Sequence, residues 1–485
     1  MKNQRRSFEN KKVIFCYHSL VPSRTLRSIP EICIGALALF FFVRELGTFP
    51  AAWADDSLFM IVARQVAEGR GYMLPVLQHQ WIYPPVLGVG PTLILPVALT
   101  IKLFGFSVVA ARVPMVLFLF ASTVAFYLLT KRTSGVNAAR WSTLLLITLS
   151  AFVNTGKPVL GEIPGFFFLG LGFLFLARKQ TIPLAIAAGF LFGLAILTKI
   201  TYGLILPALF IAWIVAATRR DRKEFVHLMI TGLVAIVPFA LWLLWGEGRS
   251  PGGLLTEFKF MFSGAEAESL TPFSYIATHP AILMSIPFLS FVIIAVLGFV
   301  GFLQVRKKVP LRLSVTLWTL ITLFLLYYLS SFGWYRHLLP AHLLLLLFVP
   351  LGTAALFRKK IGGLALIAII AAQTYWQLDH RGASTNPHAD TVAEYIETNF
   401  AERPLIVQQT EIFVRLPHRS YWYFLTNPTM SKRIPQEFVT LSPIQRCMPI
   451  VRKLGEEDQK EFFGRLLTLS GSYFLIDPPA DCHST

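Results

Sequence analysis

Two adjacent carboxylates, Asp55 and Asp56, stand in the stretch AAWADDSLFMIVARQVAEGRGY, directly after an apolar segment. A third carboxylate, Glu162, stands in NTGKPVLGEIPGFFF between two further apolar segments. A bilayer tolerates charged side chains poorly, so acidic residues placed beside membrane-length segments are candidates for function. A carboxylate can serve as the general base for a hydroxyl group, or as negative charge beside a developing cation. We therefore take Asp55, Asp56 and Glu162 as candidate catalytic residues.

The acidic pair also suits a simpler role at the start of a helix. Carboxylates at the N-cap or in the first turn stabilise the positive end of a helix. The residues that follow are amphipathic, with Leu58, Ile61 and Val62 on one side, which predicts a helix lying along the membrane interface with its start facing outside water. The two interpretations are compatible, because a capping residue can also be catalytic.

The composition indicates a membrane protein with many spans. Of the 485 residues, 55% are hydrophobic and 14% are charged, and the mean hydropathy is +0.60. The net charge of +18 would suggest a nucleic-acid partner in a soluble protein. Here residues 379–485 carry 11 Lys and Arg against 13 Asp and Glu, so the basic excess lies in the apolar part of the chain. We expect membrane lipid and no nucleic acid as a partner.

Apolar windows of about 20 residues predict about eleven transmembrane helices. These spans are residues 30–48, 107–130, 138–154, 161–177, 181–198, 200–218, 226–246, 281–304, 312–331, 338–357 and 361–378. If the N-terminus is cytoplasmic, 23 Lys and Arg fall on the inside, as the positive-inside rule requires. The predicted regions are a basic cytoplasmic tail (1–29), a membrane domain (30–378) with outside loops at 50–106 and 247–280, and an extracytoplasmic domain (379–485).

Two parts of the chain depart from the pattern of spans. Residues 83–104 could cross the membrane by length, but they have five Pro and Gly in their first nine residues, and a full crossing would invert every later loop. We interpret them as a second interfacial or re-entrant helix. Residues 379–485 combine helical spacing in TVAEYIETNF with short strands in PLIVQQ and SYFLIDPP, which predicts a small α/β domain. Cys447 and Cys482 could form a disulfide there.

Five stretches resemble, in order, the membrane-embedded glycosyltransferases of the C superfamily, in particular the branch of protein O-mannosyltransferases and lipid A aminoarabinose transferases. These stretches are WADDSLFMIVARQVAEGRGY, IYPPVLGVGPTLILPVALTIKLFG with ARVPMVLFLFASTVAFYLLTKR, GKPVLGEIPGFFFLGLGFLFL, AGFLFGLAILTKITYGLILPALF and YRHLLPAHLLLLL. The resemblance implies a polyprenyl-phosphate monosaccharide donor and sugar transfer outside the membrane with inversion at the anomeric carbon. It maps the essential carboxylate of the family onto Asp55, and Asp56 onto a neighbour that is often Glu. Glu162 matches a second acidic position, where relatives commonly have Asp followed directly by Pro.

Such a donor also requires cations, because the leaving phosphate monoester must be stabilised rather than protonated. The candidate phosphate ligands on the outside are Lys199 in LTKITYG, Arg336 and His337 in GWYRHLLP, and Lys157. Lys157 precedes Glu162 by five residues and could pair with it or with phosphate. Lys199 could also be a helix-end lysine whose ammonium reaches the head groups.

The WIYPPV stretch differs from the family pattern, since relatives often have His or Lys before the Pro and this chain has Tyr83. His79 lies nearby, and we expect both residues to support the site. A divalent metal, if bound, would lie near Asp55, Glu162 and His79, but a lone surface His is more often not a ligand. We therefore do not favour a metal cofactor.

The main alternative is a transporter or flippase for a lipid-linked or glycan substrate. Transporters place ionisable residues near the midplane of their spans and often contain inverted repeats, whereas here Arg44 and Glu45 near one end of the first span are the closest such residues. A polymerase or ligase of lipid-linked oligosaccharides usually has one large late outside loop, which this sequence lacks. We expect a bacterial inner-membrane protein, and an envelope glycan, lipid A and protein all remain open as acceptors.

Overall fold

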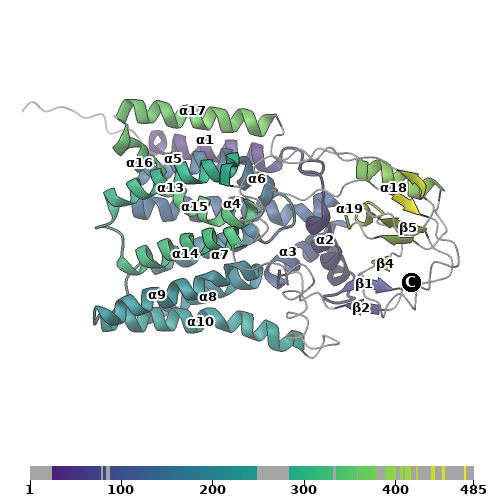
Figure 1. The fold of residues 1–485 in the computed structure, drawn as a ribbon, viewed down its shortest axis with the longest axis horizontal. Coiled ribbons are helices and arrows are strands. Elements are labelled where there is room, and N and C mark those ends of the chain that lie inside the picture. Colours follow the sequence, from purple (N-terminus) through teal and green to yellow (C-terminus); the bar gives the residue numbers. More distant parts are fainter. Residues whose placement is uncertain are drawn as a thin grey trace, which may run out of the picture.

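The computed structural model describes residues 24–77, 80–82, 88–247, 283–330, 335–357, 359–379, 388–399, 405–407, 410–416, 422–423, 439–442, 450–453 and 474–476. These residues form a long bundle of helices, and several shorter helices and two small sheets lie at one end of it (Figure 1). The predictions for Cys447, Cys482, His79 and Tyr83 fall outside the described residues, as do most of the 1–29 tail and of the 247–280 loop.

The bundle contains six helices that are long and apolar enough to cross a membrane within the described residues, or up to eight spans if each of two bent pairs is one span. Its elements are α1 (Arg24–Val43), α4 (Val108–Ser134), α5 (Val136–Thr148), α6 (Ser150–Gly156), α7 (Glu162–Leu176), α8 (Ile182–Thr198), η2 (Ile200–Leu204), α9 (Ile205–Thr218), α10 (Arg222–Glu247), α13 (Ile286–Val305), α14 (Leu311–Ser330), α15 (Tyr335–Leu346), α16 (Val349–Leu356) and α17 (Lys359–Leu378). The bent pairs are α5–α6 and α15–α16, and α1, α7 and α8 are shorter apolar helices. The multi-span helical membrane fold is confirmed, and the number eleven stays a prediction.

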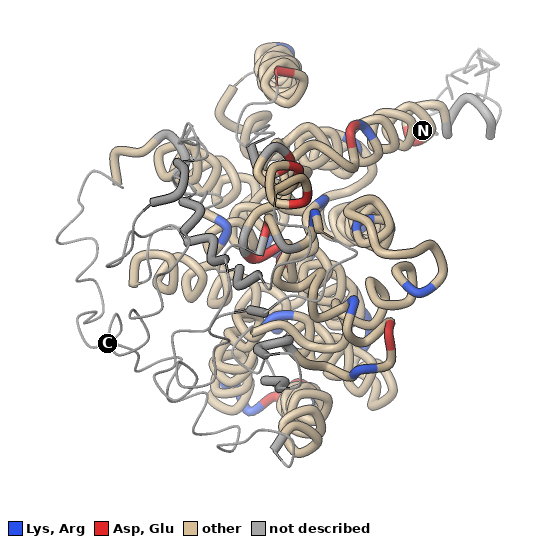
Figure 2. The backbone as a smooth tube through the Cα atoms, turned by 90° about the vertical axis from the view of Figure 1, so that its right-hand side faces the viewer, with Lys and Arg blue, Asp and Glu red and all other residues tan. Residues whose placement is uncertain are grey.

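The outer face of the bundle is apolar. Leu117, Leu233 and Leu244 are 64%, 61% and 74% exposed, although each lies in a helix of the bundle. In water such a surface would drive association, whereas in a bilayer these side chains contact lipid tails. Figure 2 shows the bundle from the end that has the small sheets. The apolar part of each of the six long helices carries at most two charged residues.

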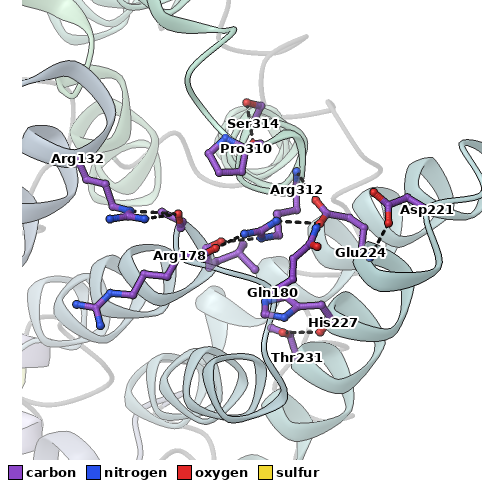
Figure 3. A network of polar contacts seen from close by, with 12 residues as sticks. Arg132, Arg178, Gln180, Asp221, Glu224, His227, Thr231, Pro310, Arg312 and Ser314 are labelled. Carbon is purple, nitrogen blue, oxygen red and sulfur yellow. Dashed lines mark hydrogen bonds and ion pairs between the residues drawn. The ribbon is translucent and has the colours of Figure 1, made fainter.

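A network of polar contacts lies at the C-terminal end of α7 (Figure 3). Arg312 of α14 donates hydrogen bonds to the carbonyls of Leu176 (2.8 Å) and Arg178, and it pairs with Glu224 of α10 (2.8 Å). Gln180 also donates to Glu224. The last carbonyls of a helix have no partner within it, and a cation at this negative end stabilises them. The network therefore connects α7, α8, α10 and α14 at the same end of the bundle.

At the other end, α2 (Ala54–Ala67) and α3 (Pro91–Phe104) pack against each other, next to the hairpin of β1 (Leu74–Leu77) and β2 (Gln80–Ile82). The four consecutive residues Met60, Ile61, Val62 and Ala63 are all fully buried. The middle of α2 is therefore covered all round, whereas the sequence predicts a helix with one side in water. The difference arises because a segment about 350 residues later in the chain, α19 (Thr410–Phe413), packs on α2.

The C-terminal segment contains a five-stranded sheet with the order β4–β3–β5–β7–β6. Its elements are α18 (His388–Asn399), β3 (Leu405–Val407), α19, β4 (Trp422–Tyr423), β5 (Val439–Ser442), β6 (Ile450–Lys453) and β7 (Phe474–Ile476). β3 pairs in parallel with β4 and β5, and β7 is antiparallel to β5 and β6. The apolar side chains of Val392, Ile396 and Ile412 share one core with those of α2, so this segment supports the helix that begins with the acidic pair.

Candidate active site

Glu162 and Lys199 meet because α7 begins and α8 ends at the same level of the bundle. Glu162 is the first residue of α7, and Lys199 directly follows the last residue of α8. The extended backbone of Lys199 forms a β-bridge with Val89, just before α3. Gly161 allows this approach, because a Cβ atom there would lie 2.9 Å from the Cβ of Lys199. The Lys199 ammonium donates to Oε1 of Glu162 in a largely buried ion pair.

Asp55 and Arg336 form a second ion pair beside the first. Nη1 of Arg336, in the first turn of α15, donates to Oδ2 of Asp55 in the first turn of α2 over 2.6 Å. Nε of the same guanidinium lies 3.9 Å from Oε1 of Glu162. Asp55 is 34% exposed while Arg336 is 7% exposed. Two carboxylates and two cations from four separate parts of the chain thus form one cluster, and Asp55 is its most accessible member.

Asp56 points the other way and is completely buried. Its Oδ2 accepts a hydrogen bond from Nη2 of Arg112 (2.6 Å), and its Oδ1 accepts one from the backbone amide of Val159 (2.6 Å). Burial raises the pKa of Asp56, while the Arg112 guanidinium and the Val159 amide oppose that rise. Asp56 therefore ties the start of α2 to α4 and to the loop that leads into Glu162.

Trp53 and Tyr202 complete the surroundings of the cluster. The guanidinium of Arg336 lies over the Trp53 ring, 5.2 Å from its centroid, which is a cation–π contact. The Tyr202 hydroxyl donates to the backbone carbonyl of Glu162. Sequence reasoning missed both aromatic residues and Arg112. Only the position of Trp53 next to the acidic pair could have suggested it. Arg112 lies 56 residues after Asp56, so no short sequence pattern links the two.

The remaining predicted site residues are Lys157, His337, His79 and Tyr83. Lys157 is buried outside the cluster, and its ammonium donates to the backbone carbonyl of Arg44 over 2.7 Å. Burial lowers the pKa of Lys157 to about 7. His337 follows Arg336, and its ring packs against Tyr327 with centroids 4.9 Å apart. His79 and Tyr83 have no assigned position, because both lie outside the described residues.

The cluster balances its charges internally. Burial lowers the pKa of Lys199, and the neighbouring Glu162 carboxylate opposes this drop. Oε2 of Glu162 is buried and has no hydrogen-bond partner within the described part of the chain. Unpaired buried carboxylate oxygens are costly, so this oxygen is suited to accept a hydrogen bond from a hydroxyl group of a bound ligand.

The described residues contain no group of three His, Cys, Asp or Glu side chains that could hold a metal ion. Asp55 and Glu162 are instead paired with Arg336 and Lys199. A divalent ion at this position would have to displace these cations, so the arrangement suits a ligand that is itself anionic.

Residues 89–245 match the family described as dolichyl-phosphate-mannose-protein mannosyltransferase. Among solved structures, ArnT from Cupriavidus metallidurans in the apo state superimposes with a TM-score of 0.63 at 13% identity, over 93% of this chain and 98% of that one. ArnT bound to undecaprenyl phosphate gives a TM-score of 0.62 over the same shares. The oligosaccharyltransferase AglB from Archaeoglobus fulgidus, in complex with an inhibitory peptide and a dolichol-phosphate, gives 0.55 at 10% identity, over 80% of this chain and 63% of that one. Curated protein sequences provide no match.

Proposed function

Taking the chain as a membrane glycosyltransferase with the C-superfamily fold, we propose that it moves a monosaccharide from a polyprenyl-phosphate donor to a hydroxyl group, with inversion at the anomeric carbon. The observation that carries the proposal is the contact of Arg336 with Asp55 beside Glu162 and Lys199. Support for the donor class comes from the relatives, since ArnT binds undecaprenyl phosphate and AglB binds a dolichol-phosphate.

Asp55 is the proposed general base. In the transfer, the acceptor oxygen attacks the anomeric carbon as its proton passes to an Asp55 oxygen. The bond between that carbon and the phosphate oxygen breaks, and its electron pair stays on the phosphate. Asp55 suits this role because it is the most accessible member of the cluster, and a base must reach the proton that it removes. Asp56 is buried and held by Arg112, so its proposed contribution is to fix the start of α2.

Arg336 and Lys199 are the proposed ligands of the donor phosphate. Both cations are neutralised by carboxylates within the cluster. When Asp55 takes up the acceptor proton it loses its negative charge, and the guanidinium of Arg336 is then available to the negative charge that develops on the leaving phosphate. Proton removal and phosphate stabilisation are thereby coupled through one side chain. Glu162 holds Lys199 and offers Oε2 to a sugar hydroxyl.

The remaining assignments extend the proposal to the whole chain. We assign residues 1–29 to a cytoplasmic tail, 30–378 to a catalytic membrane domain with about eleven spans, and 379–485 to an extracytoplasmic α/β domain. The setting is the outer side of a bacterial inner membrane, and the acceptor is an envelope glycan, a lipid or a protein. His337 directly follows Arg336, and Lys157 precedes Glu162 by five residues. The ion pairs of the cluster are made by Arg336 and Lys199, which therefore carry the phosphate assignment.

A transfer assay tests the proposal. Purified full-length protein in lipid nanodiscs is incubated with a panel of polyprenyl-phosphate monosaccharides, and release of polyprenyl phosphate and formation of sugar product are measured. We expect release from at least one donor, and we expect Arg336→Met to abolish it. A flippase would move the lipid-linked sugar between leaflets without breaking the bond to phosphate, and that result would overturn the proposal.

A further inference from the structure

A buried lysine stands five residues before Glu162 in the sequence but takes no part in the ion pairs of the cluster. Lys157 follows the last residue of α6 and is 1% exposed. Its ammonium donates to the carbonyl of Arg44 and lies 5.6 Å from the centroid of the Phe49 ring. Within the described residues, no carboxylate lies within 4.0 Å of this ammonium. A buried cation with no carboxylate in direct contact is costly, so its position calls for an explanation.

Arg112 contacts the same short segment. Its Nη1 donates to the carbonyls of Leu46 (3.1 Å) and Pro50 (2.8 Å). Together with the Lys157 contact, two buried cations therefore hold three backbone carbonyls between residues 44 and 50. This segment connects α1 to Trp53 and Asp55, so its path decides where the acidic pair begins.

Lys157 also stands at the start of the loop that leads into α7 and its first residue, Glu162. The amide of Val159, two residues further, donates to Asp56, and α7 begins at Glu162. The ammonium of Lys157 thus links the segment before Asp55 to the loop before Glu162. The two segments are more than 100 residues apart in the sequence.

We propose that Lys157 is a positioning residue that holds segment 44–50 against loop 157–161, and so sets the distance between Asp55 and Glu162. The proposal rests on the proposed function of the cluster and refines it. It assigns Lys157 no contact with donor phosphate, because the ammonium is buried against Phe49 and bound to a main-chain carbonyl. Methionine at this position would fill much of the volume but could not donate to Arg44.

The first test separates positioning from phosphate binding. Full-length wild type, Lys157→Met and Lys102→Met are compared in nanodiscs, since Lys102 is an exposed lysine in the last turn of α3. We expect Lys157→Met to lower kcat at least ~10-fold, because displacements of about 1 Å can cost up to ~100-fold in rate. Its affinity for undecaprenyl phosphate should stay within about twofold, as for Lys102→Met. Loss of that affinity with an unchanged kcat would identify Lys157 as a phosphate ligand and overturn the proposal.

The second test does not depend on activity. Hydrogen–deuterium exchange of peptides that cover residues 44–56 should be faster in Lys157→Met than in wild type and unchanged in Lys102→Met. Unchanged exchange in Lys157→Met would overturn the positioning role. If the wild type neither transfers sugar nor binds polyprenyl phosphate, the proposed function fails, whereas the exchange result still decides whether Lys157 holds the segment.

Discussion

Nη1 of Arg336 lies 2.6 Å from Oδ2 of Asp55, although the two residues are 281 positions apart in the chain. The same guanidinium lies 3.9 Å from Glu162 and stacks on Trp53. An arginine in this position can bind two acceptors at once through its planar array of donors. The guanidinium and the two carboxylates therefore form one cluster of charges.

Arg336→Lys should not preserve function. The ammonium of lysine is a point charge, so it cannot reach Asp55 and Glu162 together or stack on Trp53 as a guanidinium does. We expect kcat/KM for sugar transfer to fall at least ~10-fold, with weaker binding of undecaprenyl phosphate. Steady-state kinetics and lipid-phosphate binding measure the two effects. Arg64→Lys, at an arginine that pairs with Glu68 within α2, is the matched control and should leave both values unchanged.

Asp56→Asn should act mainly on stability. The substitution leaves Arg112 buried without a carboxylate, and removing one partner of a buried ion pair typically costs about 3–5 kcal/mol. We expect a lower thermal unfolding midpoint of the detergent-solubilised protein. The double variant Asp56→Leu with Arg112→Leu removes both charges and should recover part of the loss. A single variant as stable as wild type would show that the pair contributes little.

Glu162 and Lys199 should behave as a coupled pair. Glu162→Gln and Lys199→Met each break the same contact, so the effects of the two substitutions on the rate of transfer should not add. Residues in contact commonly show coupling energies of about 0.5–3 kcal/mol in a double-mutant cycle. The rates of the two single variants and of the double variant measure this energy. Strict additivity would mean that the two residues contribute to transfer independently.

Lys157 should make stability depend on pH. Burial, helped by the nearby charges of Arg112 and Arg44 and opposed by Glu45, lowers its pKa in the folded protein from 10.5 to about 7. Between about pH 7 and 10.5 the unfolded chain therefore binds more protons at this position, and the stability of the folded state rises with pH. Thermal unfolding at about pH 7, 8 and 9 should show a smaller rise in Lys157→Met than in wild type. Parallel curves for the two proteins would contradict the assignment.

The candidate carboxylates could be proposed from the sequence because acidic residues are rare in the membrane part of the chain. Only ten Asp and Glu lie between residues 51 and 378, and the cost of charge in a bilayer makes each of them informative. Lys199 and Arg336 could be proposed because they stand at ends of apolar segments. The carboxylates with which they form ion pairs could not be predicted, because that depends on which helix ends lie at the same level of the bundle. The structure brings Asp55, Glu162, Lys199 and Arg336 together.

Two features of the site depend on contacts that no local pattern contains. Asp56 is adjacent to Asp55 and chemically identical, yet a partner 56 residues later makes it a buried anchor. The sequence of α2 predicts that one face of the helix is in water. In the structure α19, from near the other end of the chain, packs on α2. The spacing of polar and apolar residues along a helix describes only its own faces, and it cannot show what a remote segment will bury.

Asp55 is the proposed base that activates the acceptor, and the mechanism depends on this role. The most direct measurement is the rate of sugar transfer by Asp55→Asn in nanodiscs under single-turnover conditions, with Asp221→Asn as the matched control. Asp221 is exposed and caps the start of α10 at the other end of the bundle, and asparagine can cap equally well. We expect Asp55→Asn to bind undecaprenyl phosphate but to transfer sugar ~100-fold or more slowly, since a general base contributes about 10²–10⁴-fold. Transfer at the wild-type rate by Asp55→Asn would contradict this role.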